Sequence, residues 1–294
     1  MSAVVAASRW LVTGAGGQLG RAVLALARER GVTAIGVTRA QLDVGDADAV
    51  KRALDERQPD VLLNCAAFTA VDRCESEPAE AERANALAPA LLAQACRGGP
   101  LLVHLSTDYV FDGCASQPVP EDAPTRPLSA YGRSKLRGEE AVRGTAGEHL
   151  IVRTQWVFGD GANFVRTILR AAAKGESLRV VEDQIGRPTW SHSLASGIFG
   201  AVAAGARGTL HLANEGIASF FDLASAAVGE GAQRRLCPRV EVRAIASSEM
   251  PRPAIRPAYG VLSLARARSL GVRLPHWRDA LHQYLDAERG GRDA

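Results

Sequence analysis

The stretch RWLVTGAGGQLG, residues 9–20, decides the fold that we predict for this chain. It begins as a short apolar strand and runs into three glycines at intervals of three, Gly14, Gly17 and Gly20. Glycines at this spacing allow a tight turn, and the helix predicted over 21–29 offers unpaired N–H groups at its start. A strand, a glycine turn and a helix in this order are typical of a dinucleotide-binding βαβ unit.

The same alternation continues along the first half of the chain. We predict further strands and helices over these ranges: strands 32–37, 61–65, 101–106 and 150–154, and helices 47–57, 79–96 and 129–142. Apolar runs such as VLL at 61–63 suit strands that are buried on both faces. The sequence therefore predicts an α/β fold of the Rossmann type, with a doubly wound parallel sheet whose ligands lie beyond the carboxyl ends of its strands.

The rhythm of strands and helices loosens after residue 154, where proline and arginine become more frequent. We expect residues 1–154 to form the dinucleotide-binding domain. Residues 155–286 are expected to form mainly a smaller C-terminal lobe that binds substrate, partly interleaved with the first domain. Residues 287–294 are polar and contain glycine, so we expect a frayed tail there.

The segment SAYGRSK, residues 129–135, places Tyr131 and Lys135 four residues apart. On a helix capped by Ser129, both side chains project from one face. An ammonium beside a phenol favours the phenolate, so we expect the pKa of Tyr131 to fall from about 10 towards neutrality and the phenol to act as a proton donor. The alternative is a chance pair on a solvated helix face.

Two further segments follow predicted strands at the edge where ligands are expected. Ala66 and Ala67 come after the strand 61–65, and their small side chains would let a cofactor ribose approach the backbone. Thr107 follows the strand 101–106 and is expected to hydrogen-bond a carbonyl oxygen together with Tyr131. The alternative for Thr107 is a strand-end hydroxyl bonded only to local backbone.

The end of the second strand bears on the choice of cofactor. An acid at this position usually holds the ribose of NAD, but here Val37 is followed by Thr38 and Arg39. Arg39 could pair with a 2′-phosphate, so we expect NADPH, with NADH left open because Arg39 can equally be a solvated turn residue. Asp43, the nearest acid, lies in the next loop, where we expect an adenine contact.

Composition argues against several classes of partner. The 294 residues contain 35 Lys and Arg against 32 Asp and Glu, and this net charge of +3 is too small to indicate a nucleic-acid partner. Arg252 and Arg256 could still meet a phosphate locally. No apolar run is long enough to cross a bilayer, and the five cysteines lack the spacing of a disulfide framework or a zinc site. We expect a soluble, cytoplasmic protein with no membrane partner.

Six motifs together resemble the dTDP-4-dehydrorhamnose reductase family of the extended short-chain dehydrogenase/reductase superfamily. They are GGQLG (16–20), AAFTAVD (66–72), STDYVFDG (106–113), YGRSKLRGE (131–139), RTQWVF (153–158) and DQIGRPT (183–189). The resemblance extends from residue 9 to about residue 286. It implies NAD(P)H-dependent reduction of the C4 ketone of a dTDP-4-keto-6-deoxyhexose.

The resemblance also implies roles for individual residues. Tyr131 would donate a proton to the C4 oxygen, Lys135 would tune it and hold the nicotinamide ribose, and Thr107 would polarise the carbonyl. The cofactor would be lined by Gly17, Gln18, Leu19, Asp43, Val44, Ala67 and Phe68. The sugar nucleotide would be contacted by Thr69, Val71, Asp108, Tyr109 and Trp156. For Trp156, stacking on the substrate and plain core packing remain alternatives.

Two departures from the family pattern leave the sugar open, namely Gln155 and the pair Tyr259-Gly260. A 4-ketoreductase for a different deoxysugar of antibiotic biosynthesis is therefore an alternative. A non-catalytic, cofactor-binding regulatory subunit of the same fold is another. We find no match to the glutamates that hold magnesium in some relatives, so we predict no metal. The sequence leaves the oligomeric state open, a homodimer being one option.

Overall fold

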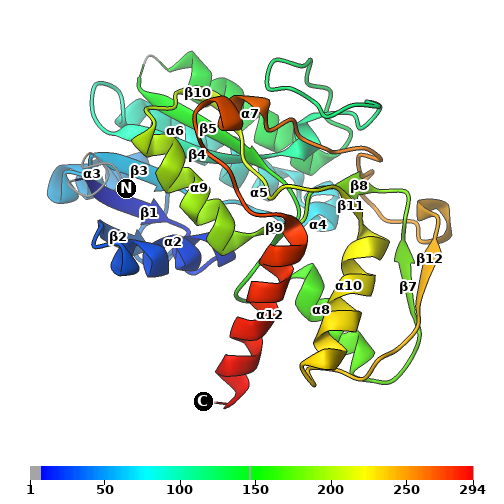
Figure 1. Ribbon diagram of the computed structural model, residues 1–294. Helices are drawn as coiled ribbons and strands as arrows, with labels where there is room; N and C mark the ends of the chain where they lie inside the picture. The colour runs from blue at the N-terminus through cyan, green and yellow to red at the C-terminus, as the bar shows by residue number, and fades with distance from the viewer. Residues whose placement is uncertain (1–7, 146, 294) are drawn as a thin grey trace.

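The computed structural model describes residues 8–145 and 147–293, and its centre is a parallel sheet (Figure 1). Six strands pair in the order β10-β5-β4-β3-β1-β2. They are β1 (Arg9–Thr13), β2 (Thr33–Val37), β3 (Val61–Asn64), β4 (Leu101–Thr107), β5 (His149–Thr154) and β10 (Gly208–His211). Every pairing in this sheet is parallel. The predicted fold class is confirmed, and β2 to β5 begin and end within one residue of the predicted bounds.

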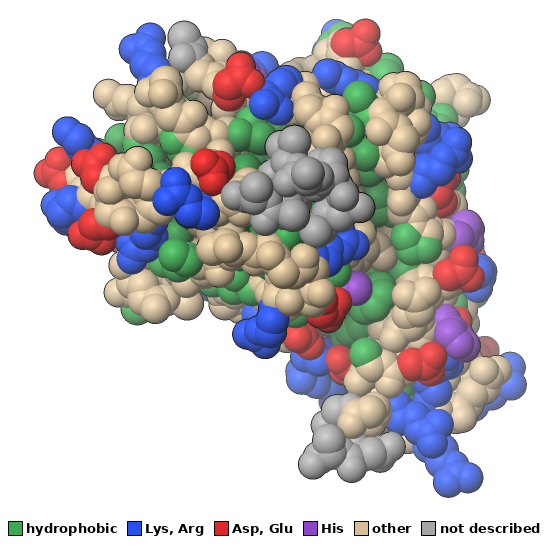
Figure 2. All heavy atoms as spheres, turned by 60° about the vertical axis from the view of Figure 1, so that its left-hand side comes forward, with side chains coloured by type: hydrophobic (Ala, Val, Ile, Leu, Met, Phe, Trp, Pro, Cys, Tyr) green, Lys and Arg blue, Asp and Glu red, His purple; other side chains and the backbone are tan. Residues whose placement is uncertain are grey.

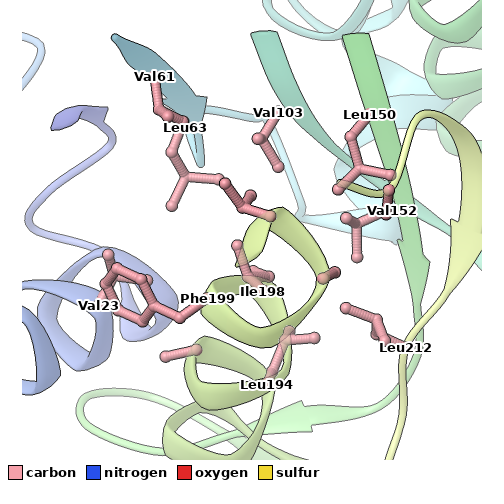
Figure 3. Close-up of a cluster of buried hydrophobic side chains, with 14 of the residues drawn as sticks. Val23, Val61, Leu63, Val103, Leu150, Val152, Leu194, Ile198, Phe199 and Leu212 are labelled. Atoms are coloured by element: carbon pink, nitrogen blue, oxygen red, sulfur yellow. The ribbon is translucent and has the colours of Figure 1, made fainter. Parts of the chain in front are cut away.

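Helices cover both faces of the sheet, so its strands are buried on both sides. One face packs against α2 (Gln18–Glu29) and α9 (Ser191–Ala203), and the other packs against α3 (Ala47–Arg57), α6 (Ala88–Ala95) and α7 (Ala130–Gly144). In Figure 3, Leu194 and Ile198 of α9 point towards the strand side chains Leu63, Val103 and Val152, all of them fully buried. Each such side chain contributes about 1.5–3 kcal/mol by leaving water, and together they hold the carboxyl ends of the strands in fixed positions.

The helix predicted over 79–96 contains a π-helical turn. It consists of α5 (Pro78–Glu82), the π-turn η1 (Arg83–Leu87) and α6, and within it the Ala88 N–H donates to the carbonyl of Arg83, five residues earlier. Pro89 has no N–H, so the carbonyl of Asn85 has no α-helical donor and the wider turn is favoured. A short helix, α4 (Val71–Ser76), also forms where we predicted no helix or strand; its N-cap, Ala70, gives no capping signal.

The second lobe is built on three helices and three short strand pairs. The helices are α8 (Phe164–Ala172), α10 (Phe220–Gln233) and α12 (Trp277–Asp293). The strand pairs are β6 (Val157–Phe158) with β9 (Thr189–Trp190), β7 (Leu178–Val181) with β12 (Val242–Ile245), and β8 (Ile185–Gly186) with β11 (Ala218–Ser219). The remaining elements are η2 (Asp108–Val110), η3 (Ser247–Glu249) and α11 (Ala265–Ser269). The second lobe has an apolar core of its own, which contains Phe158, Trp277 and Leu281.

The two lobes are not continuous in sequence. Residues 191–211, within the range that we assigned mainly to the second lobe, form α9 and β10 and belong to the first sheet. At the other end, α12 continues into the predicted tail 287–294, and Glu288 makes an ion pair with Arg166 at 2.5 Å. The prediction of a frayed tail is therefore wrong for Glu288, because this ion pair holds Glu288 against the second lobe. Residues 1–7 and 294 lie outside the described residues.

On the face of the molecule in Figure 2, Lys and Arg side chains are interspersed with Asp and Glu side chains. This mixture agrees with the small net charge of +3. Among the described residues, every helix is too short or too polar to span a lipid bilayer.

Candidate active site

The two halves of the sheet meet between β1 and β3, where the strand order reverses. Gly14 follows β1 with a φ of +65°, and a Cβ there would lie 2.7 Å from the backbone nitrogen of Ala66, which follows β3. Only glycine fits this close approach in this conformation. The chain segments after both strands consequently border one crevice, at the position where a doubly wound sheet binds its ligand.

We call this crevice the cofactor crevice. Its walls are formed by Gly14, Gly17, Arg39, Leu42, Asp43, Val44, Gly45, Cys65, Ala66, Ala67, Phe68, Glu80, Arg83, Ala84 and Ala88. Helix α2 begins at its edge after Gly17, which supplies no side-chain cap. The first N–H groups of α2 are therefore available to an anion such as a pyrophosphate. The glycine approach, the free N–H groups and the small side chains of Ala66 and Ala67 fit a dinucleotide.

Three of the predicted cofactor residues turn their side chains elsewhere or have none to offer. Gln18 Nε2 donates to the carbonyl of Ala162 at 3.1 Å, and Leu19 packs against the core beneath the sheet. A Cβ on Gly20 would lie 2.4 Å from the carbonyl oxygen of Gly14, so this glycine permits close packing of helix on turn. Gly20 can meet a ligand in the crevice only through its backbone, whereas the side-chain oxygen of Gln18 has no hydrogen-bond partner among the described residues.

The charged residues of the crevice are paired with one another. Arg39 lies 3.2 Å from Glu80, with 69% of its side chain exposed, and Arg83 donates to Asp43 at 2.7 Å. Exposed ion pairs of this kind contribute at most about 1 kcal/mol, so a phosphate can take the place of Glu80 beside Arg39.

The predicted catalytic tyrosine and threonine meet next to this crevice. Helix α7 begins where predicted, since the Ser129 side chain accepts the N–H of Gly132 at 3.1 Å. Tyr131 is buried, and its ring packs edge-on against Tyr109 with centroids 5.4 Å apart. The hydroxyls of Tyr131 and Thr107 are hydrogen-bonded to each other. Two hydroxyl groups thus converge at the carboxyl end of β4.

Our prediction that Lys135 lowers the pKa of Tyr131 is wrong. The ammonium of Lys135 donates to the carbonyl of Leu105 at 2.6 Å, and burial lowers its own pKa to about 8. Burial raises the pKa of Tyr131 above its ordinary value, and the hydrogen bond to Thr107 opposes the rise only in part. Tyr131 is consequently a neutral phenol that retains its proton near pH 7.

A buried ion pair that we did not predict lies one turn beyond Lys135 on α7. Glu139 is fully buried and accepts from Arg153 at 2.9 and 2.7 Å and from Ser106 at 2.5 Å. It therefore ties α7 to β5 and to the strand residue that precedes Thr107. A signal was present in the sequence, because Arg153 is a charged residue inside the apolar run LIVRT at 150–154.

Asn85, in the π-turn, is a second residue that we did not predict. Its side chain accepts the N–H of Phe68 at 2.9 Å and donates to the Phe68 carbonyl at 3.0 Å. It also donates to Ser134 of α7 at 3.1 Å. Asn85 thereby fixes the backbone of the cofactor crevice relative to the helix that carries Tyr131. The sequence gives no local signal for this role, because the three partners come from separate segments.

A second hollow, which we call the substrate hollow, opens on the other side of the segment 66–71. It is lined by Thr69, Val71, Tyr109, Phe164, Thr167, Ile168, Arg179, Val180, Val181, Gln184, Phe220, Met250, Arg252 and Arg256. Tyr109 belongs both to this wall and to the contact with Tyr131. The predicted substrate residue Trp156 stacks on Phe220 at 3.7 Å, so it supports the wall from behind.

Arginines gather at the mouth of the substrate hollow. Arg256 holds Asp72 through two hydrogen bonds of 3.1 and 3.0 Å, which lower the pKa of that carboxyl group. Arg252 lies 3.9 Å from the same carboxylate, with 54% of its side chain exposed. A phosphate in the hollow would therefore meet Arg252 rather than the neutralised Arg256.

The family model described as RmlD substrate binding domain matches residues 8–289. A dTDP-4-dehydrorhamnose reductase from Mycolicibacterium smegmatis is 42% identical over 97% of this chain and 88% of its own. A probable dTDP-4,6-dihydroxy-2-methyloxan-3-one 4-ketoreductase from Streptomyces antibioticus is 43% identical over 94% of each chain. The crystal structure of dTDP-4-dehydrorhamnose reductase from Bacillus anthracis in complex with NADP has a TM-score of 0.89 and 31% identity, covering 95% of this chain and 99% of that one. The chain belongs to the dTDP-4-dehydrorhamnose reductase family.

Proposed function

We propose that the chain is an NAD(P)H-dependent sugar-nucleotide 4-ketoreductase that acts on the C4 ketone of a dTDP-4-keto-6-deoxyhexose. The observation that carries the proposal is the pair of hydroxyls of Tyr131 and Thr107, buried between the cofactor crevice and the substrate hollow. The crevice fits a dinucleotide, and the hollow combines aromatic rings with arginines, which suits a nucleoside diphosphate. Family membership supports the same reaction.

The chemistry requires hydride at carbon and a proton at oxygen. The bound dihydronicotinamide supplies the hydride. Tyr131 donates its hydroxyl proton to the C4 oxygen, and Thr107 donates a hydrogen bond to the same oxygen. These donors stabilise the charge that develops on oxygen more than they stabilise the ketone. Lys135, a cation at pH 7 with a pKa of about 8, would hold the nicotinamide ribose.

The activity is tested by following NADPH oxidation with a panel of dTDP-linked 4-keto-6-deoxyhexoses and analysing the products. We expect turnover of at least one panel member to the 4-hydroxy sugar. A chain that binds NADPH but turns over no panel member would instead be a regulatory subunit of this fold. The same experiment identifies which of these sugars the chain reduces. Gln155, one of the two departures from the family pattern, joins the carbonyl of Gly260 to the N–H of Arg187 through its amide, at 2.9 and 3.0 Å.

We propose NADPH as the preferred cofactor because Arg39 lines the crevice beyond β2. Replacing Arg39 by alanine removes one charge-assisted contact to the 2′-phosphate, worth about 1.5–3 kcal/mol, and should weaken NADPH binding about ten- to a hundredfold. NADH binding should change less than about threefold. The measurement is a fluorescence titration of both cofactors, with Arg83→Ala as the matched control that affects both alike. Equal losses for Arg39→Ala would show that Arg39 does not read the phosphate.

The homodimer and the cytoplasmic location stay predictions.

A further inference from the structure

Asp108 is a carboxyl group enclosed by protein at the end of β4. The residue is 2% exposed, and the hydroxyl of Thr107 donates to its Oδ1 at 3.0 Å. On the other side, a Cβ at Gly260 would lie 2.5 Å from its Oδ2. Gln155 donates to the carbonyl of Gly260 at 2.9 Å and keeps this wall in place. The carboxyl group is thus confined beside the hydroxyl that we assign to the ketone.

The hydroxyl of Thr107 has one proton and two lone pairs. One lone pair accepts the N–H of Tyr109 at 3.2 Å. A carboxylate can only accept hydrogen bonds, so charged Asp108 accepts a hydrogen bond from the hydroxyl of Thr107. A ketone oxygen is also only an acceptor. The ketone and charged Asp108 therefore compete for the hydrogen bond that the Thr107 hydroxyl can donate.

We propose that Asp108 is a positioning residue whose protonation decides whether the Thr107 hydroxyl donates to the substrate ketone or to Asp108. The proposal rests on the ketone reduction proposed above. In the complex, Tyr131 donates to the ketone and no longer occupies the second lone pair of Thr107. When Asp108 is protonated, its own O–H donates to that lone pair, and the Thr107 hydroxyl is free to donate to the ketone. When Asp108 is charged, the ketone keeps Tyr131 as a donor but loses Thr107.

Asp108 changes its protonation state near neutral pH. Burial raises the pKa of Asp108 to about 7, although the hydrogen bond from Thr107 and backbone N–H groups oppose the rise. The titratable groups on the elements around it include Asp72, Cys74, Tyr109, Tyr131, Lys135, Arg256 and Tyr259, together with Glu139 on α7 and His104 on β4. Arg256 is neutralised by Asp72, and burial raises the pKa of Cys74 to about 11. Lys135, with a pKa of about 8, is the other group that titrates nearby.

The test is the pH profile of kcat, between about pH 6 and pH 9, for the full chain and the variant Asp108→Asn. The amide of asparagine donates to Thr107 at every pH, as protonated Asp108 does. We expect kcat of the unmodified chain to fall about tenfold per pH unit above about pH 7. In Asp108→Asn the fall in kcat should begin at least about one pH unit higher, where Lys135 titrates. Asp112→Asn, four residues along the same segment, should keep the original profile.

An Asp108→Asn profile with the original midpoint would overturn the proposal. If Asp108→Asn does not fold, Thr107→Val replaces it. This variant should lose activity at pH 6 and lack the fall above pH 7, whereas Thr107→Ser should retain that fall. A readout independent of activity separates failure of this proposal from failure of the reductase assignment. The infrared difference spectrum between pH 6 and pH 8 should show loss of a carboxylic-acid band that Asp108→Asn lacks, and its absence from the unmodified chain would count against the proposal.

Discussion

Replacing Tyr131 by phenylalanine is expected to lower kcat about 10²- to 10⁴-fold while leaving NADPH affinity within about threefold of its original value. The phenol is buried and keeps its proton, because burial raises its pKa. Phenylalanine preserves the edge-on packing against Tyr109 and removes only the proton donor. The measurement combines steady-state NADPH oxidation with a fluorescence titration of cofactor binding.

Tyr284→Phe is the matched control for Tyr131→Phe. Its hydroxyl is also enclosed by protein, where it donates to the carbonyl of Gly159 at 3.3 Å, but it belongs to α12 of the second lobe. This control should retain kcat within about threefold. Unchanged turnover in Tyr131→Phe would mean that the proton reaches the C4 oxygen from another group.

Replacing Glu139 by alanine is expected to lower the free energy of unfolding by about 3–5 kcal/mol. The guanidinium of Arg153 is 2% exposed, and without Glu139 it would be a buried charge with no carboxylate partner. Ser106 would lose its acceptor in the same step. Urea unfolding followed by circular dichroism measures the loss.

The next residue of α7, Glu140, is exposed and provides the control. Glu140→Ala should change the free energy of unfolding by no more than about 0.5 kcal/mol. The double variant Glu139→Leu with Arg153→Met should recover much of the loss, since two apolar side chains replace the isolated charge. A cost below about 1 kcal/mol for Glu139→Ala would contradict the structural role of this ion pair.

The sequence predicted the first five strands well because each is a short apolar run bounded by turn residues. The runs at 61–63 and 101–103 needed no knowledge of their partners to be recognised as buried on both faces. The π-turn was missed even though its cause, Pro89, is in the sequence, because a proline near a helix start usually fits without distortion. The two-residue strands of the second lobe were missed because they form only by pairing with distant segments, such as β8 with β11.

Within the candidate site, the sequence predicted the chain segments better than their electrostatics. Spacing alone placed Tyr131 and Lys135 on one helix face, but it could not reveal that the ammonium points to the carbonyl of Leu105. The sign of the pKa shift of Tyr131 depends on burial, which is a property of the assembled fold. Arg179 and Phe220 were missed for a related reason, since the substrate hollow collects residues from segments more than 100 positions apart.

The strand β10 has a consequence for how proteins of this shape can diverge. The chain passes through β6 to β9 in the second lobe before it returns to add α9 and β10 to the first sheet. Neither lobe is a single contiguous stretch, so no one recombination point exchanges a whole lobe with that of another protein. Transfer of the whole second lobe would therefore need several crossovers, whereas a point substitution along the walls of the hollow leaves both lobes intact.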